Sequence, residues 1–289
     1  MRNDHAATPA GYLADHGSRV QALDRGLAIL DILADADRPM GVSDIASVLR
    51  VSLPTASRLA ATLRQRGLLH QEVRGGRYSL GLGLVRFARG ALDSHPLELA
   101  SADVLVGLLA ELDDTISLAV PSGAGVLYVR SLSPPDRIFS ISFPAGKLLP
   151  YHSTATGKVL LAFGSSERVE DLIAHGLARR TRHTITDSGT LRQALARVRE
   201  CGYAVDSGEG DVNVGCVAVP VHARGEVTAA LGCSLARAEL SPQRVEQIVE
   251  ALVAAAEAIE AALTRSTAQG RANGAQSGPY ARKHLEGTS

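Results

Sequence analysis

Residues 41–63 read GVSDIASVLRVSLPTASRLAATL, and this stretch decides the fold of the N-terminal part of the chain. Ser43 is placed to cap one short helix and Ser52 to cap a second, because a serine hydroxyl accepts hydrogen bonds from the free N–H groups of a first helical turn. Pro54 falls in the first turn of the second helix, where a missing N–H costs nothing. The stretch therefore predicts two short helices joined by a tight turn.

The second of these helices has two different faces. Apolar residues at the spacing i, i+3, i+4, i+7 predict a buried face made of Ala56, Leu59, Ala60 and Leu63. Another face is short, polar and positive, and consists of Thr55, Arg58 and Thr62. A helix-turn-helix that enters the major groove of DNA needs a second helix of this kind. The alternative is a short helical hairpin that packs on an ordinary core.

A two-stranded ribbon is predicted directly after the second helix. Leu68–Arg74 and Arg77–Leu80 read as strands, and Gly75-Gly76 between them permits the positive φ of a two-residue hairpin turn. A hairpin in this position is the wing of a winged helix. Its tip carries Arg74 and Arg77, which suit contacts with phosphate or with the minor groove.

Charge supports a polyanionic partner for this part of the chain. Residues 50–92 contain eight arginines and one acid, whereas the whole chain of 289 residues balances 30 basic with 30 acidic residues. The local excess lies on the wing and beside the second helix, where a polyanion would feel it. A solvated basic face is the alternative, and it predicts no such placement.

Composition excludes several other classes of protein. The three cysteines, Cys201, Cys216 and Cys233, lie far apart without a C-x-x-C motif, so we expect reduced thiols, no metal site and no cofactor. No apolar run reaches the roughly 18 residues of a membrane-spanning helix, so we expect no membrane association and a cytoplasmic protein.

The chain length predicts two domains. Residues 1–18 read as a disordered lead, and residues 19–82 as a winged helix-turn-helix domain. The first helix of that domain is amphipathic, and we expect its leucines to face the core: Leu23, Leu27, Leu30 and Leu33. Residues 83–95 form a linker helix with an apolar stripe. It either packs on its twin in a dimer or lies on the surface of its own chain.

Residues 96–265 are predicted to form the second domain, followed by a disordered tail at 266–289. Helices are expected at 97–112, 154–163, 167–175, 190–200 and 241–264, and strands at 115–120, 126–132, 137–143, 203–206, 214–221 and 227–235. Strands and helices mix without strict alternation and hairpins are evident. This pattern indicates an α+β domain with a mainly antiparallel sheet.

Several segments, in order along the chain, resemble one known family: Val20–Leu30, Thr55–Leu59, Gly76–Gly81, Leu149–Lys158, Thr184–Asp187, Gly202–Asp206, Cys216–Val221 and Ala229–Leu231. Each motif is weak alone, but their order makes the match specific, and the chain resembles the IclR-type transcriptional regulators. The resemblance implies a winged helix-turn-helix joined to a GAF-like α/β domain that binds a small-molecule effector. It also implies a homodimer or a dimer of dimers on a palindromic operator of double-stranded DNA.

The chain departs from the family pattern at a few positions. Arg50 stands in the turn where the family usually has glycine, and an arginine there costs on the order of 1 kcal/mol if the position needs positive φ. Asn213 stands near a usual glycine, and asparagine tolerates the left-handed conformation. Leu235-Ala236 replaces a usual Gly-Pro at the edge of the pocket.

The candidate DNA-contact residues lie on the second helix and the wing: Ser52, Thr55, Ser57, Arg58, Arg74 and Arg77. Arg58 has a structural alternative, an ion pair with Asp44. The resemblance places the effector pocket on Ala155, Thr156, Asp206, Cys216, Gly232 and Ser234. Ala155 and Thr156 open a helix, and the N–H groups of a helix N-terminus favour an anion such as a carboxylate.

Each polar pocket residue also has a structural alternative. Asp206 can cap a turn, Cys216 can be an ordinary core residue, and Ser234 can pair within the sheet. His152, which precedes the pocket helix, reads as a structural histidine rather than a ligand contact.

The sequence thus predicts a DNA-binding transcriptional regulator, and not an enzyme, whose operator affinity is controlled by a small organic or aromatic acid. Two alternatives remain open. One is an enzyme that uses Cys216 as nucleophile and His152 as base. The other is a winged-helix module that contacts another protein.

Overall fold

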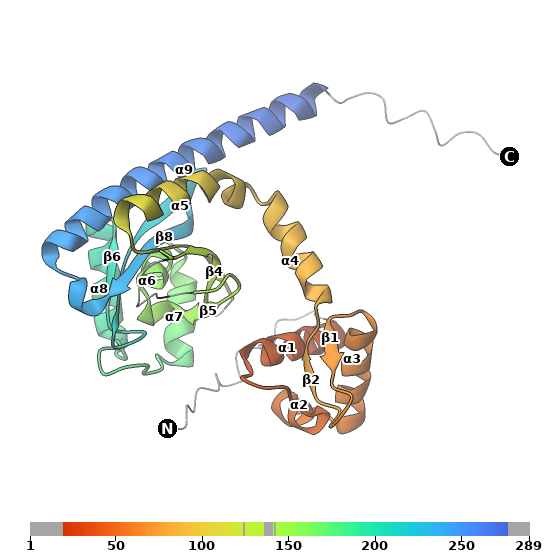
Figure 1. Ribbon diagram of the computed structural model, residues 1–289. Helices are drawn as coiled ribbons and strands as arrows, with labels where there is room; N and C mark the ends of the chain where they lie inside the picture. Colours follow the sequence, from red (N-terminus) through yellow and green to blue (C-terminus); the bar gives the residue numbers. More distant parts are fainter. Residues whose placement is uncertain (1–19, 124, 136–140, 142, 277–289) are drawn as a thin grey trace. The chain divides into compact units, whose positions relative to one another are not determined.

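The computed structural model describes residues 20–123, 125–135, 141 and 143–276, and it describes residues 266–276 by their backbone alone. The chain divides into two compact units, with the boundary between Ser94 and His95 (Figure 1). The predicted lead at 1–18 and most of the strand predicted at 137–143 lie outside the described residues.

The first unit is a winged helix-turn-helix. Its elements are α1 (Gln21–Asp35), α2 (Val42–Leu49), α3 (Leu53–Gln65), β1 (Leu69–Gln71), β2 (Tyr78–Leu80) and α4 (Gly83–Ser94). The three helices and the ribbon enclose one core, which contains Ala28, Ile29, Leu33, Ile45, Ala46, Leu49, Ala56, Ala60, Leu69 and Tyr78. The predicted helix-turn-helix and its wing are therefore confirmed.

The prediction for the inward face of α1 was partly wrong. Leu33 is buried and Leu30 packs against the core, as predicted, but Leu23 and Leu27 are 63% and 52% exposed, and Ala28 and Ile29 are buried in their place. The helix carries two apolar stripes at helical spacing, and periodicity alone does not say which of them meets the core. The small Gly26 lies on the buried stripe.

Two local predictions near α2 and the wing also need correction. Helix α2 begins at Val42 with Gly41 as its cap residue, and the Gly41 N–H donates to Asp44 Oδ2 at 3.2 Å, so Ser43 is not the cap. Gly75 and Gly76 do have positive φ, 88° and 60°. The turn is nevertheless longer than two residues, because the ladder closes at the bond from Glu72 N–H to Arg77 O, 2.9 Å, and residues 73–76 form the tip.

The second unit is built on a six-stranded sheet in the order β5-β4-β3-β8-β7-β6. The strands are β3 (Thr115–Ser122), β4 (Gly125–Leu132), β5 (Leu148–Pro150), β6 (Ala204–Ser207), β7 (Val214–Ala223) and β8 (Glu226–Ala236). Every described pair of neighbours is antiparallel, which confirms the α+β prediction. β5 was not predicted, because three residues carry too little periodicity.

Helices cover both faces of this sheet. α5 (Pro96–Leu112) and α9 (Pro242–Gln276) run together on one face, and α6 (Ala155–Ala162) packs on the other (Figure 1). A 3₁₀ turn, η2 (Tyr151–Ser153), leads into α6, and α7 (Ser166–His175) and α8 (Ser188–Cys201) complete the α6 side. A second 3₁₀ turn, η3 (Arg237–Glu239), precedes α9.

Helix α9 continues to Gln276, beyond the end expected near Thr264, so the predicted tail does not begin at residue 266. Residues 265–276 contain no proline. Extending an existing helix adds one hydrogen bond for each residue fixed, so a weakly apolar segment can continue the helix.

Candidate nucleic-acid interface and effector site

Helix α3 presents its predicted contact residues away from the core. Ala56 and Ala60 are fully buried, whereas Ser57 and Arg58 are exposed and Thr55 is half-buried. Ser52 is the N-cap residue, as predicted. Its hydroxyl bonds the Thr55 hydroxyl at 2.9 Å rather than a backbone N–H. The two hydroxyls therefore hold each other at the start of the helix.

The arginines at the predicted contact positions, Arg58, Arg74 and Arg77, have no acidic partner among the described residues. Asp44 accepts from the Gly41 N–H, and no ion pair joins it to Arg58 in the described part of the chain. Arg74 and Arg77 are exposed on and beside the ribbon tip, likewise without an ion pair among the described residues. The structural alternative for Arg58 is thus not observed, and three guanidinium groups remain available to phosphate or to base edges.

Arg50 sets the turn between α2 and α3. It has φ 53° and ψ 43°, the left-handed conformation, and its N–H closes α2 onto the carbonyls of Ala46 and Ser47. The turn therefore has the geometry in which glycine is favoured. Asn213, by contrast, is not among the described residues with positive φ, so it needs no left-handed conformation.

In the second unit, the predicted pocket residues meet on the α6 side of the sheet. In the strand register Asp206 lies opposite Cys216, and Cys216 lies opposite Ser234. At Gly232, a Cβ atom would lie 3.0 Å from Thr156 Cγ2, 3.2 Å from Ser117 Oγ and 3.6 Å from Cys216 Sγ. Three strands and the first turn of α6 therefore converge on one point.

These residues are buried, and burial controls their ionisation. Asp206 is 4% exposed. Burial raises the pKa of Asp206 to about 7, even though Glu209 N–H donates to its Oδ1 at 2.6 Å. Burial also raises the pKa of the Cys216 thiol to about 12. Ala155 is fully buried in the apolar cluster beneath α6, which it shares with Val159.

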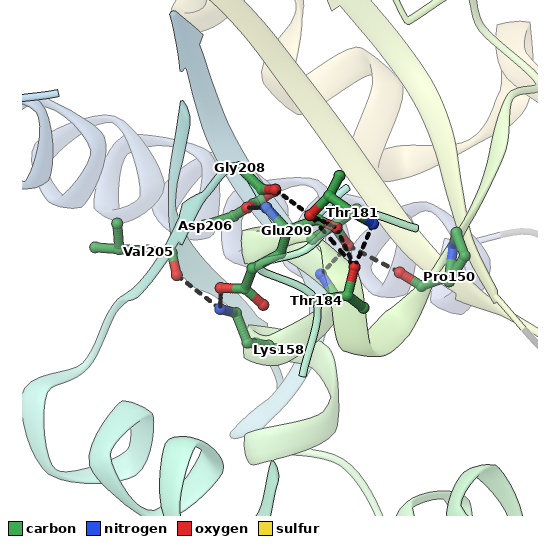
Figure 2. Close-up of polar contacts among 10 residues, drawn as sticks. Pro150, Lys158, Thr181, Thr184, Val205, Asp206, Gly208 and Glu209 are labelled. Atoms are coloured by element: carbon green, nitrogen blue, oxygen red, sulfur yellow. Dashed lines mark hydrogen bonds and ion pairs between the residues drawn. The ribbon is translucent and has the colours of Figure 1, made fainter. Parts of the chain in front are cut away.

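A network of polar contacts fixes the loop that follows β6 against α6. Lys158 forms a buried ion pair with Glu209, and its Nζ also donates to Val205 O at 2.7 Å. Thr181 Oγ1 donates to Gly208 O at 2.6 Å, and Thr184 Oγ1 donates to Glu209 O at 2.7 Å (Figure 2). The network therefore holds in place the Glu209 backbone N–H that donates to Asp206.

His152 has a structural role in this arrangement. Its Nε2 lies 2.9 Å from Ala178 O, and burial lowers its pKa. No hydrogen bond joins His152 to Cys216 in the described residues. The pair required by the enzyme alternative is thus not assembled, and the Cys216 thiol stays protonated near neutral pH.

Comparison with known proteins decides the family. Residues 22–73 match the model of the IclR helix-turn-helix domain, and residues 89–261 match that of the bacterial transcriptional regulator IclR C-terminal domain. The chain belongs to the IclR family. A curated relative, the glycerol operon regulatory protein of Streptomyces coelicolor, is 34% identical over 205 residues, covering 71% of this chain and 80% of the relative.

Solved structures of IclR-family proteins have the same fold. An IclR transcriptional regulator from Alicyclobacillus acidocaldarius matches with a TM-score of 0.76 and 27% identity, over 85% of this chain and 100% of that one. An IclR homologue from Microbacterium hydrocarbonoxydans, complexed with 4-hydroxybenzoate, matches with a TM-score of 0.67 and 27% identity, over 84% and 99% of the two chains. The protein is a transcriptional regulator with a DNA-binding unit and an effector-binding unit.

Sequence reasoning missed two residues that lie beside the predicted pocket residues. Tyr128 OH lies 2.9 Å from Thr156 Oγ1, and burial raises the Tyr128 pKa. Ser117 reaches the same point beside Gly232. A signal for Ser117 was present in β3, where Thr115, Ser117 and Ala119 alternate with larger apolar residues. The Lys158–Glu209 pair had no such signal, because 51 residues separate its partners.

The described residues contain no group of three or more His, Cys, Asp or Glu side chains that could hold a metal ion. None of the described helices is long and apolar enough to cross a membrane.

Proposed function

We propose that this IclR-family regulator binds its operator through α3 and the wing. Ser52, Thr55, Ser57 and Arg58 would lie against the major groove, and Arg74 and Arg77 against phosphate or the minor groove. The observation that carries the proposal is the position of Arg58. It is exposed on the side of α3 opposite the buried Ala56 and Ala60, with no acidic partner among the described residues.

We infer that two copies bind together. Leu23 and Leu27 of α1 are exposed, and α4 buries no side chain and leaves Phe87 55% exposed. These apolar side chains can pack against a second copy, since large exposed apolar residues in clusters mark interaction sites. Paired recognition helices would read two half-sites about 34 Å apart on a palindromic operator, as a dimer or a dimer of dimers.

We propose a small carboxylic acid, aliphatic or aromatic, as the effector. It would bind among Ala155, Thr156, Asp206, Cys216, Gly232 and Ser234. The first turn of α6 favours an anion, and an IclR homologue of the same fold binds 4-hydroxybenzoate. The bound acid would favour one arrangement of the paired DNA-binding units and so change operator affinity.

The buried, protonated Cys216 supports a unit that binds its ligand without transforming it. The high pKa leaves too little thiolate for nucleophilic attack. We therefore propose that the protein is not an enzyme, and that it acts in the cytoplasm, where a bacterial operator lies.

The test is operator binding by the full chain, measured by gel shift with the DNA upstream of its own gene. We expect binding that weakens steeply with salt, and Arg58→Ala should weaken it further. Arg74→Ala and Arg77→Ala should each reduce the salt slope by about one. Arg197→Ala, an exposed arginine on α8, is the matched control and should change nothing.

Absence of binding at low salt would contradict the proposal. Unchanged DNA affinity in Arg58→Ala and Arg77→Ala would instead favour the protein-interaction alternative. In a module that contacts protein, these side chains are not needed for DNA binding.

A further inference from the structure

A polar row of side chains crosses the α6 side of the sheet from β4 to β6. In the strand register Thr115 lies opposite Ser234, which lies opposite Cys216, which lies opposite Asp206. At the β4 end, Thr115 Oγ1 donates to Ser133 Oγ at 3.1 Å. Four neighbouring positions in the buried sheet, and Ser133 just after β4, thus carry a hydroxyl, a thiol or a carboxyl group.

A second row beside it continues this surface. Ser131 lies opposite Ser117, and Ser117 lies opposite Gly232. Ser131 Oγ is buried without a hydrogen-bond partner among the described residues. Ser117 Oγ reaches only Gly232 O at 3.5 Å, which is a weak contact. We refer to Ser131, Ser117, Thr115 and Ser234 together as the hydroxyl floor.

The hydroxyl floor is not needed to build the sheet. On the opposite face the alternate residues of the same strands are apolar, as with Ile116, Leu118 and Leu231, and they pack beneath α5 and α9. Buried hydroxyls that lack partners cost folding free energy, and apolar residues would avoid that cost. Within the floor, Thr115 bonds Ser133 and Ser234 bonds Cys216, whereas Ser131 has no partner among the described residues and Ser117 has a weak one. The hydroxyls of Ser131 and Ser117 are therefore better explained by a ligand that bonds them.

We infer that the effector is a hydroxylated aliphatic carboxylic acid of the sugar-acid type, whose hydroxyl groups bond the hydroxyl floor. The inference rests on the proposed function and narrows its ligand class. A chain with several hydroxyls can donate to and accept from Ser131, Ser117 and Ser234 at once. A benzoate ring has an apolar face, so it would cover these serines without giving them partners.

The aromatic side chains of the site are consistent with this narrower class. Tyr128 and Phe143 lie with ring centroids 5.0 Å apart, and the Tyr128 hydroxyl is already engaged with Thr156. These two rings pack on each other and form one wall of the site. The small opening at the Thr115–Ser234 end, about 10 Å³, holds about one water, so an acid must enlarge the site as it enters.

The experiment compares matched acids on the full-length protein, first by thermal shift and then by titration calorimetry. The pairs are D-gluconate with hexanoate and D-glycerate with propanoate, and benzoate and 4-hydroxybenzoate complete the panel. A ligand that binds only the folded state raises the melting temperature. We expect at least one hydroxylated acid to bind at least tenfold more tightly than its deoxygenated match and than either benzoate.

Two variants assign that preference to the hydroxyl floor. Ser234→Ala and Ser117→Ala should each weaken binding of the hydroxylated acid about fivefold to tenfold and leave the deoxygenated match unchanged. Ser207→Ala, an exposed serine on β6, is the matched control and should have no effect. The comparison within the panel uses the unmodified protein, so it stands even if a variant folds poorly.

Other outcomes would overturn the inference. Equal or tighter binding of a benzoate or of a deoxygenated acid would leave the proposed function in place and reject the hydroxylated class. If both serine variants bind the hydroxylated acid as tightly as the unmodified protein does, the role of the hydroxyl floor is rejected. Binding of none of the acids would reject the inference together with the proposed effector class, while operator binding would still be tested separately.

Discussion

At the scale of single residues, Arg50 stores strain in the turn that defines the DNA-binding unit. It holds φ 53°, a conformation that costs a residue with a Cβ roughly 1–2 kcal/mol. The rest of the turn enforces it, since the Arg50 N–H closes α2. The glycine usual at this position in the family would relieve the strain, although glycine is also freer in the unfolded chain.

We therefore expect Arg50→Gly to stabilise the first unit by about 0.5–1 kcal/mol. Hydrogen exchange of the α2 and α3 amides in the full chain measures this, because it reports the free energy of opening for each segment. Arg66→Gly is the matched control. Arg66 also ends a helix and is exposed, but its φ is −83°, so glycine there should stabilise nothing. Equal protection of the α2 and α3 amides in the two variants would contradict the assignment of strain to Arg50.

Asp206 makes the second unit less stable as pH rises. Burial raises its pKa from an ordinary 3.8 to about 7, so the native state keeps a proton that the unfolded state releases between those values. Stability should therefore fall as pH rises from about 4 to 7, by at most on the order of 4 kcal/mol from this group. Asp206→Asn should remove that slope, as measured by urea unfolding at pH 5 and pH 8.

Asp187 provides a control of opposite sign. The hydrogen bond from the Thr190 N–H holds the pKa of this exposed carboxyl below its usual range. Its contribution is present above the unfolded pKa and is lost only as pH falls through the native one. Asp187→Asn should thus leave the change between pH 5 and pH 8 intact, and an effect equal to that of Asp206→Asn would refute the assignment.

At the scale of elements, the Lys158–Glu209 pair joins α6 to the loop after β6 (Figure 2). Both side chains are buried, and in the described part of the chain Glu209 Oε2 has no hydrogen-bond partner. Removing one member leaves an uncompensated buried charge, which typically costs about 3–5 kcal/mol. Removing both charges avoids most of that cost, so the pair fixes the loop more than it adds stability.

We expect Lys158→Met to destabilise the second unit by about 3–5 kcal/mol in urea unfolding, and the double variant Lys158→Met/Glu209→Gln to recover most of the loss. The exposed pair Arg192–Glu170 is the control. Arg192→Met should cost less than about 1 kcal/mol, because solvent screens that pair. Additive effects in the double variant would show that the two charges do not depend on each other.

Elements with strong local signals could be predicted from the sequence. Helix α3, the ribbon glycines and the antiparallel strands follow from periodicity, capping residues and turn chemistry. The inward stripe of α1 could not be chosen, because both of its stripes are apolar and only tertiary packing decides between them. The pocket could be placed only through the family resemblance, and Lys158–Glu209 not at all, because the fold alone brings distant residues together.

At the scale of the whole molecule, the two units must communicate if an effector in the second is to change DNA binding by the first. Coupling of this kind needs two arrangements that the ligand and the operator stabilise to different extents. The exposed apolar residues of α1 and α4 offer a contact between two copies, and such a contact can have two arrangements. If coupling passes through the dimer, a monomer should bind its effector normally, but the bound effector should not change operator affinity.

Thermodynamic linkage makes this testable in both directions. If an acid from the thermal-shift panel changes operator affinity by some factor, operator DNA must change the affinity for that acid by the same factor, typically about 5–150-fold. Calorimetric titration of the acid with and without operator measures it. Phe87→Glu on α4 should give a monomer by sedimentation, keep the acid affinity and lose the coupling, while Ala196→Glu, exposed on α8, should keep both. Coupling that survives in a monomer would place it within one chain, because no second copy would remain to carry it.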